Sequence, residues 1–126
     1  MGVHIVPHCV LEYTSNIVEK QDNRKILLEI NNMMAGTGLF NLADIKSRVI
    51  VHDDYVIGEG SKSSAFVALD ISILTGRDTV VKKLLSQSAL DILKRAFSRS
   101  MEQLDCSVTV RITEMEREVY QREKSY

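Results

Sequence analysis

The chain has 126 residues, 44% hydrophobic and 26% charged, with a single proline; this is enough for one packed domain and too short for two. A formal net charge of -1 excludes a field that would draw the whole chain to nucleic acid or an anionic membrane. Because no apolar run approaches the roughly 20 residues that span a bilayer, and the N-terminus lacks a secretory signal pattern, we expect a cytoplasmic protein without membrane association.

The first half of the chain reads as a strand, a helix and a second strand. The apolar run at 8–13 precedes a polar turn and predicts a strand. Over residues 22–34, apolar side chains recur at the spacing of one helical face, and the glycines within 35–38 predict the end of that helix. Residues 45–52 alternate between apolar and polar side chains, which predicts the second strand.

The second half repeats this order. A connection rich in glycine and serine at 58–61 leads into a predicted strand at 65–73. The longest helical pattern extends over 79–104, and its apolar stripe is expected to pack on the sheet. Alternating valine and isoleucine at 107–113 predict the last strand, which is followed by a charged tail.

The two halves also match at a coarse level, which favours an internal repeat. The pair Leu11-Glu12 in the first predicted strand resembles Leu69-Asp70 in the third, and each half reads strand, helix, strand. Two such units predict an α+β fold in which four strands share one sheet and both helices cover one face.

The opposite face of this sheet would be uncovered in a single chain. Several residues expected on it are apolar, and soluble proteins usually bury a patch of that kind, so self-association is expected. The alternative is a monomeric ferredoxin-like module in which polar residues such as Lys46 and Arg48 solvate the face.

Several short motifs occur in the order and spacing of one enzyme family. They are Val6-Pro7-His8 with Glu12 at the strand end, Ala35-Gly36-Thr37-Gly38-Leu39-Phe40, Ile45-Lys46-Ser47-Arg48-Val49, Ser64-Ala65-Phe66-Val67 and Gly76-Arg77. On these motifs, the chain resembles the 5-carboxymethyl-2-hydroxymuconate isomerase family of the tautomerase superfamily. The resemblance implies a tautomerase-like homotrimer with pockets near subunit boundaries. It also implies isomerisation of a carboxylated dienol from aromatic catabolism, without a metal or organic cofactor.

The resemblance further implies that Pro7 is the catalytic base, acting through a free N-terminal nitrogen. The reaction needs one group that accepts a proton and returns it. An α-amino group has a pKa of about 7.7 to 8.0, and burial and nearby cations lower it, so the neutral amine is available near pH 7. A positioned proton shuttle of this kind contributes roughly 10² to 10⁴ in rate.

One feature conflicts with this role, because residues 1–6 precede the proline, whereas in the family it follows the initiator methionine directly. An internal proline nitrogen is a tertiary amide and cannot act as a base. We therefore divide the chain into an N-terminal extension at 1–6 and a single domain at 7–126. Three explanations are open. Translation begins at Val6 from a GTG codon, the extension is a cloning remnant or is removed by a protease, or the activity has been lost.

The resemblance implies cationic side chains that hold the carboxylates of the substrate. Arg77 is the leading candidate, since a guanidinium can grip a carboxylate by two parallel hydrogen bonds and Arg77 precedes a predicted helix N-terminus. The alternative is that Arg77 is a solvated turn residue without a role in binding. Lys46 and Arg48 project from the same face of a strand and either line the pocket or form a solvated or intersubunit ion-pairing face. The family typically has arginine at the position of Lys46.

His8 adjoins the proposed base and is a secondary candidate for a residue that lines the substrate pocket. A histidine held by packing and hydrogen bonding is the alternative. The three histidines of the chain share no metal-ligand spacing, so no metal site is expected.

Two other functions remain open. A non-catalytic trimeric ligand-binding or assembly protein of the same fold would bind carboxylates, or none, whatever its N-terminal residue. A superfamily hydratase or dehalogenase would use the same proline differently. Nucleic-acid binding is disfavoured, because the near-neutral chain offers no aromatic stacking platform.

Overall fold

The computed structural model describes residues 7–125, so the predicted extension at 1–6 lies outside the described residues. The four predicted strands and two long helices are confirmed. In chain order the elements are β1 (His8–Thr14), α1 (Asn23–Gly36), the short 3-10 helix η2 (Leu42–Asp44), β2 (Lys46–His52), β3 (Ser64–Leu74), α2 (Thr79–Ala96), α3 (Ser98–Gln103), β4 (Asp105–Met115) and the 3-10 helix η3 (Arg117–Val119).

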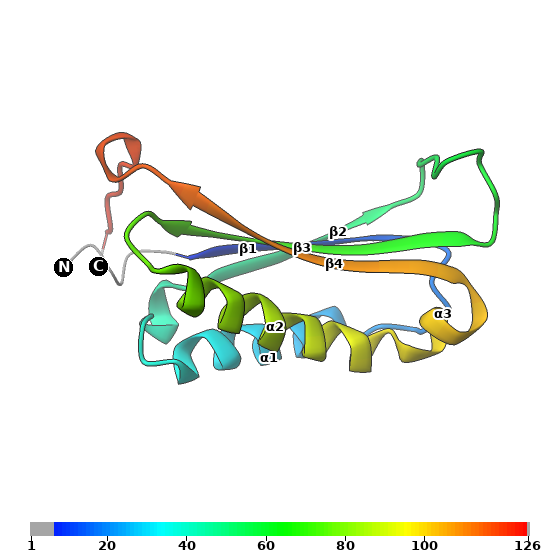
Figure 1. Cartoon of the computed structure of the whole chain (residues 1–126), viewed down its shortest axis with the longest axis horizontal. Coiled ribbons are helices and arrows are strands. Elements are labelled where there is room, and N and C mark those ends of the chain that lie inside the picture. The colour runs from blue at the N-terminus through cyan, green and yellow to red at the C-terminus, as the bar shows by residue number, and fades with distance from the viewer. Residues whose placement is uncertain (1–6, 126) are drawn as a thin grey trace.

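The strands form one sheet in the order β2-β1-β3-β4. Within each half the two strands are parallel, whereas the central pair, β1 and β3, is antiparallel, with Leu11 opposite Leu69. Helices α1 and α2 lie on the same face of the sheet (Figure 1). This arrangement confirms the α+β fold and the two β-α-β units predicted from the sequence.

The core lies between the helices and one face of the sheet. Alternate residues of each strand point to that face, and Cys9, Leu11 and Ile71 are fully buried there. The helices contribute the facing apolar side chains, which are Ile26, Ile30 and Met34 from α1 and Leu85, Ala89, Ile92 and Leu93 from α2. Burial of this apolar surface is the main force that holds the helices on the sheet.

Side-chain caps set the starts of both long helices. The Asp22 carboxylate accepts a hydrogen bond from the Lys25 backbone N–H (3.2 Å), so Asp22 is the residue before α1. Asp78 caps α2 in the same way through the Val81 N–H (3.0 Å). Beyond the other end of α1, Gly38 has a φ of +78°, a conformation that glycine adopts without strain. That turn directs the chain back toward the sheet.

The prediction of one uninterrupted helix over 79–104 is wrong, because the helix breaks at Phe97. Phe97 leaves the helical conformation (φ -115°, ψ 25°) and is fully buried. Its ring lies 5.3 Å from the ring of Tyr13, measured between centroids. The break therefore places a large aromatic side chain into the core, a gain that apolar periodicity alone does not reveal.

Glu19 stabilises the short helix α3 that follows the break. Its carboxylate accepts hydrogen bonds from the backbone N–H groups of Arg99 (2.8 Å) and Ser100 (3.1 Å), and from the Ser100 hydroxyl. Burial raises the pKa of Glu19, but these hydrogen bonds outweigh it, so the pKa lies below its ordinary value. An ionised side chain thus supplies the cap that the local sequence of α3 lacks.

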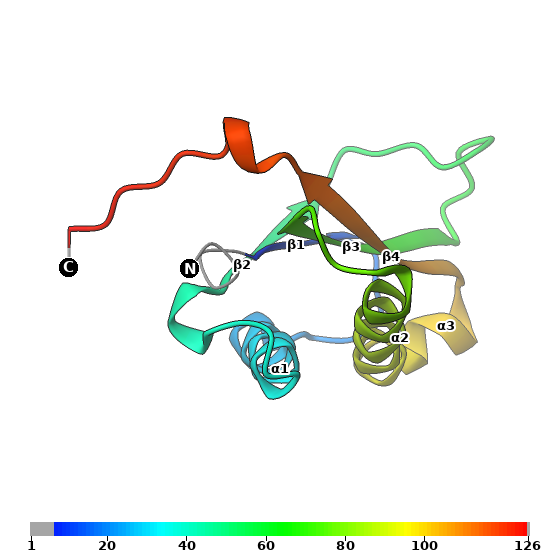
Figure 2. The same ribbon diagram turned by 60° about the vertical axis from the view of Figure 1, so that its left-hand side comes forward.

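The sheet face away from the helices carries both the apolar side chains on which self-association was predicted and the charged side chains on which the monomeric alternative rested. Ile50 is 44% exposed on this face. Beside it, His52 pairs with Glu12 (2.8 Å), and Arg111 pairs with Asp70 (3.0 Å). Figure 2 shows both long helices, α1 and α2, on the opposite side of the sheet. Among residues 7–125, no helix is long and apolar enough to cross a membrane.

Candidate functional site

Most of the predicted site residues meet where β1 begins. Because β1 and β2 are parallel, they start at the same end of the sheet, with His8 opposite Lys46. Pro7 is buried there, and its carbonyl oxygen accepts a hydrogen bond from the Lys46 backbone N–H (3.2 Å). Since β3 is antiparallel to β1, the loop that follows β3 and contains Arg77 lies at this end too (Figure 1).

His8 lies between a cation and a phenol. Its Nδ1 is 3.5 Å from Nη1 of Arg48, and its Nε2 is 3.3 Å from the Tyr120 hydroxyl oxygen. A guanidinium can only donate, so Nδ1 must be unprotonated, and we assign the proton of the neutral ring to Nε2. Burial, followed by the charges of Arg48 and Lys46, holds the pKa of His8 below its ordinary value. The site therefore keeps this histidine neutral.

We expect Arg48→Gln to raise the pKa of His8 while leaving it below 6.5. The substitution removes one of two cations, but burial, the largest cause of the lowered pKa, remains. Histidine ring signals followed by NMR across pH 4 to 8 measure the change. Arg111→Gln, which removes a cation paired with Asp70 on β3, is the matched control. If the pKa of His8 is the same in Arg48→Gln as in the unchanged protein, the assigned contact is contradicted.

Lys46 and Arg77 are each held by a backbone carbonyl at this end. The ammonium of Lys46 donates to the Asp44 carbonyl oxygen (3.1 Å). The guanidinium of Arg77 donates to the Leu39 carbonyl oxygen (3.2 Å) and lies 5.5 Å from the centre of the Phe40 ring. Arg77 is thus fixed against the loop after α1, at the same end of the sheet as His8, Lys46 and Arg48 but through different partners.

Sequence reasoning missed a second set of residues here, which come from the tail and from η2. A pocket of about 240 Å³ opens beside His8 and Lys46, and the tail residues Tyr120, Arg122, Glu123, Lys124 and Ser125 complete its lining. Asp44, which is 4% exposed, pairs with Arg122 (2.8 Å) and Lys124 (2.9 Å). The tail showed only its charge in the sequence, and its partners are distant along the chain.

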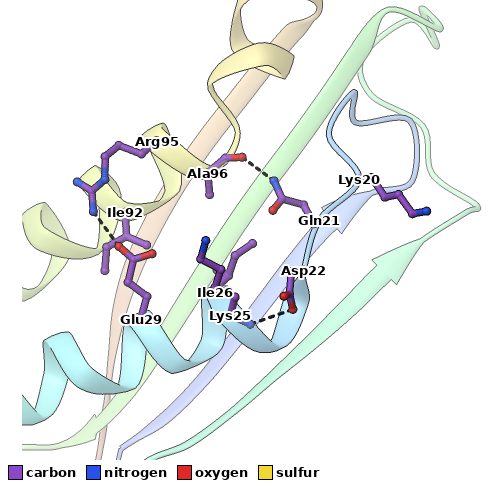
Figure 3. A pocket seen from close by; sticks show the side chains of 9 residues that line it. All are labelled: Lys20, Gln21, Asp22, Lys25, Ile26, Glu29, Ile92, Arg95 and Ala96. Atoms are coloured by element: carbon purple, nitrogen blue, oxygen red, sulfur yellow. Dashed lines mark hydrogen bonds and ion pairs between the residues drawn. The ribbon is translucent and has the colours of Figure 1, made fainter.

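A larger pocket, of about 360 Å³, lies at the other end of the molecule, between the start of α1 and the end of α2 (Figure 3). Arg95 pairs with Glu29 across it (2.9 Å), and Gln21 donates to the Ala96 carbonyl oxygen. These contacts join the two helices. Because this pocket is remote from Pro7 and its contacts serve to join the helices, we assign no chemistry to it.

Among residues 7–125, no group of three or more histidine, cysteine or acidic side chains is arranged to hold a metal ion. The expectation of a reaction without a cofactor stays a prediction.

Comparison with known proteins gives consistent matches. The family model described as 5-carboxymethyl-2-hydroxymuconate isomerase matches residues 7–125. A 5-carboxymethyl-2-hydroxymuconate Delta-isomerase from Escherichia coli is 28% identical over 110 residues, 87% of each chain. The crystal structure of a 5-carboxymethyl-2-hydroxymuconate isomerase from Deinococcus radiodurans R1 is 25% identical and covers 94% of this chain and 90% of its own, with a TM-score of 0.87. A fused 4-OT described as a symmetric trimer shares the fold at 11% identity, with a TM-score of 0.72 over 94% of each chain.

Proposed function

Because the chain belongs to the 5-carboxymethyl-2-hydroxymuconate isomerase family, we propose that it moves a proton within a carboxylated dienol such as 5-carboxymethyl-2-hydroxymuconate, with the Pro7 nitrogen as general base. One observation carries the proposal. Pro7 is buried at the start of β1, and two cationic side chains, Lys46 and Arg48, flank the adjacent His8.

The proposed chemistry is one proton transfer in two steps. The neutral nitrogen of an N-terminal Pro7 accepts the proton of the enol hydroxyl, which leaves a dienolate. The resulting ammonium returns the proton to a carbon of the conjugated system, so the product is a conjugated ketone. Nearby cations favour both steps, because they disfavour the protonated amine before substrate binds and stabilise the negative charge of the dienolate as it forms.

We assign the cations different roles according to their surroundings. Arg48 faces the developing negative charge, and its planar fork suits a carboxylate or enolate oxygen. Lys46 supplies a point charge where the family typically has arginine. Arg77 holds a carboxylate from the loop that follows β3, and neutral His8 lines the pocket without adding a charge.

We further propose that the protein acts in the cytoplasm as a homotrimer in which the uncovered sheet face lies between subunits. The apolar side chain of Ile50, which is exposed on this face of the single chain, would be buried in such an interface. A relative of the same fold is described as a symmetric trimer. The ion pairs on the face would then be buried with it.

The proposal is tested with protein whose N-terminus is verified as Pro7 by intact mass. With the dienol in D₂O, we expect loss of its ultraviolet absorbance and one deuterium on carbon in the ketone, detected by NMR. Halide release from 3-chloroacrylates in place of ketonisation would identify a dehalogenase instead. Carboxylate binding without turnover, unaffected by the N-terminal residue, would identify a ligand-binding protein. Either result would overturn the isomerase proposal.

A further inference from the structure

The C-terminal tail crosses the end of the sheet at which Pro7 lies. Where β4 ends, the Met115 carbonyl oxygen accepts a hydrogen bond from the Thr75 backbone N–H (3.0 Å), in the loop after β3. A guanidinium nitrogen of Arg117 then lies 3.4 Å from the point that a Cβ on Gly76 would occupy. The tail thus packs closely on the β3 end as it leaves β4.

The tail next reaches the ends of β1 and β2. Tyr120 contacts His8, the first residue of β1, and Arg122 and Lys124 reach Asp44, which precedes β2. The tail therefore passes the strands in their order across the sheet, from β4 over β3 and β1 to β2, and Figure 2 shows it extending past β2. We call residues 116–125 the strap.

Asp44 is the anchor of the strap. Its side chain is 5% exposed, and one of its oxygens, Oδ1, contacts both Arg122 Nη2 and Lys124 Nζ. A buried carboxylate is strongly unfavourable without partners, so this contact holds the two cations in place.

Three cationic side chains line the pocket beside His8, which we call the strap pocket. They are Lys46, Arg122 and Lys124, and Glu123 also contributes to the lining. Arg122 is 15% exposed and gives one nitrogen to Asp44. Because a guanidinium has five N–H donors, it can hold a second carboxylate at the same time.

We propose that the strap carries a subsite for a second carboxylate of the ligand, that Arg122 contacts this carboxylate and sets the preference for it, and that Asp44 is a positioning residue. The inference rests on the proposed function for the carboxylated nature of the ligand. His8, the neighbour of Pro7, lines this pocket, but Pro7 itself does not. The carboxylate held there is therefore one that lies away from the reacting enol of the ligand.

Two unreactive probes test the subsite on the full chain. Adipate carries a carboxylate at each end, and hexanoate matches its length with one. By titration calorimetry at low salt, adipate is expected to bind about tenfold more tightly than hexanoate, the effect of one charge-assisted contact. Arg122→Gln is expected to abolish this preference by weakening adipate about tenfold and hexanoate less than twofold. The matched control is Arg24→Gln, the same change at an exposed position on α1.

Asp44→Asn tests the positioning role, since it removes the anchoring charge but keeps the shape of the side chain. We expect the adipate preference to fall toward that of Arg122→Gln, and Asp44→Glu to restore part of it. A general structural defect would weaken both probes together. If Asp44→Asn does not fold by circular dichroism, Arg122→Gln alone decides the subsite.

Equal weakening of both probes by Arg122→Gln, or an adipate preference that it leaves unchanged, would overturn the inference. Neither probe is turned over, so the outcome is separate from catalysis. An inactive protein with a preference that depends on Arg122 would refute the proposed function and keep the subsite. An active protein whose adipate preference does not depend on Arg122 would support the proposed function and refute the subsite.

Discussion

Protein that begins at Pro7 is expected to ketonise a carboxylated dienol roughly 10² to 10⁴ times faster than protein that carries residues 1–6, the range for one positioned general base. In the extended chain the Pro7 nitrogen is an amide without a basic lone pair. Both forms share the sheet end, the cations and the strap, so the comparison isolates the base.

Initial rates at saturating substrate measure this effect, and intact mass confirms each N-terminus. A form with one added glycine before Pro7 controls for length, because it has a free amine one residue away from the proposed position; we expect it to be as slow as the extended form. Pro7→Ala in the shortest form keeps an α-amino group but loses the ring, so its rate is expected to fall in between. Equal rates for the extended and Pro7 forms would mean that the proline nitrogen is not the base.

The sequence was sufficient for the sheet and the long helices, because their residues alternate or recur with a regular period. The pairing of Leu11 with Leu69 in the central strands follows from the repeat of the two halves. The break at Phe97 could not be predicted in this way. The apolar stripe continues across it, and its cause is contact with Tyr13 and the cap from Glu19, both far away along the chain.

The same distinction applies to the site. Lys46 and Arg48 share a strand face, so their proximity to His8 follows from local geometry once β1 and β2 pair. Asp44 and Arg122 are 78 positions apart, and no local pattern links a carboxylate in a short turn to a charged tail. The position of the strap is therefore set by tertiary structure. The sequence predicted a site made of strand residues, whereas in the structure the C-terminal tail also lines the pocket.

Arg48→Gln in the Pro7 form is expected to lower kcat/KM by roughly 10² to 10³, the effect of removing one preorganised donor to a developing oxyanion. Arg48 is exposed on an edge strand, so stability should change by no more than about 0.5 kcal/mol. Thermal unfolding checks this expectation. Arg95→Gln, which removes an exposed ion pair with Glu29 on the helical side, is the control and should retain its rate.

The pH of the assay separates the guanidinium's own contribution from its effect on His8. The pKa of His8 lies below 6.5 with Arg48 present and is expected to rise toward 6.5 without it. At pH 8 the ring is therefore neutral in both proteins, and any loss of rate reflects the missing guanidinium. A loss seen at pH 6 but absent at pH 8 would show that Arg48 acts only through His8, and would remove it from direct contact with the substrate.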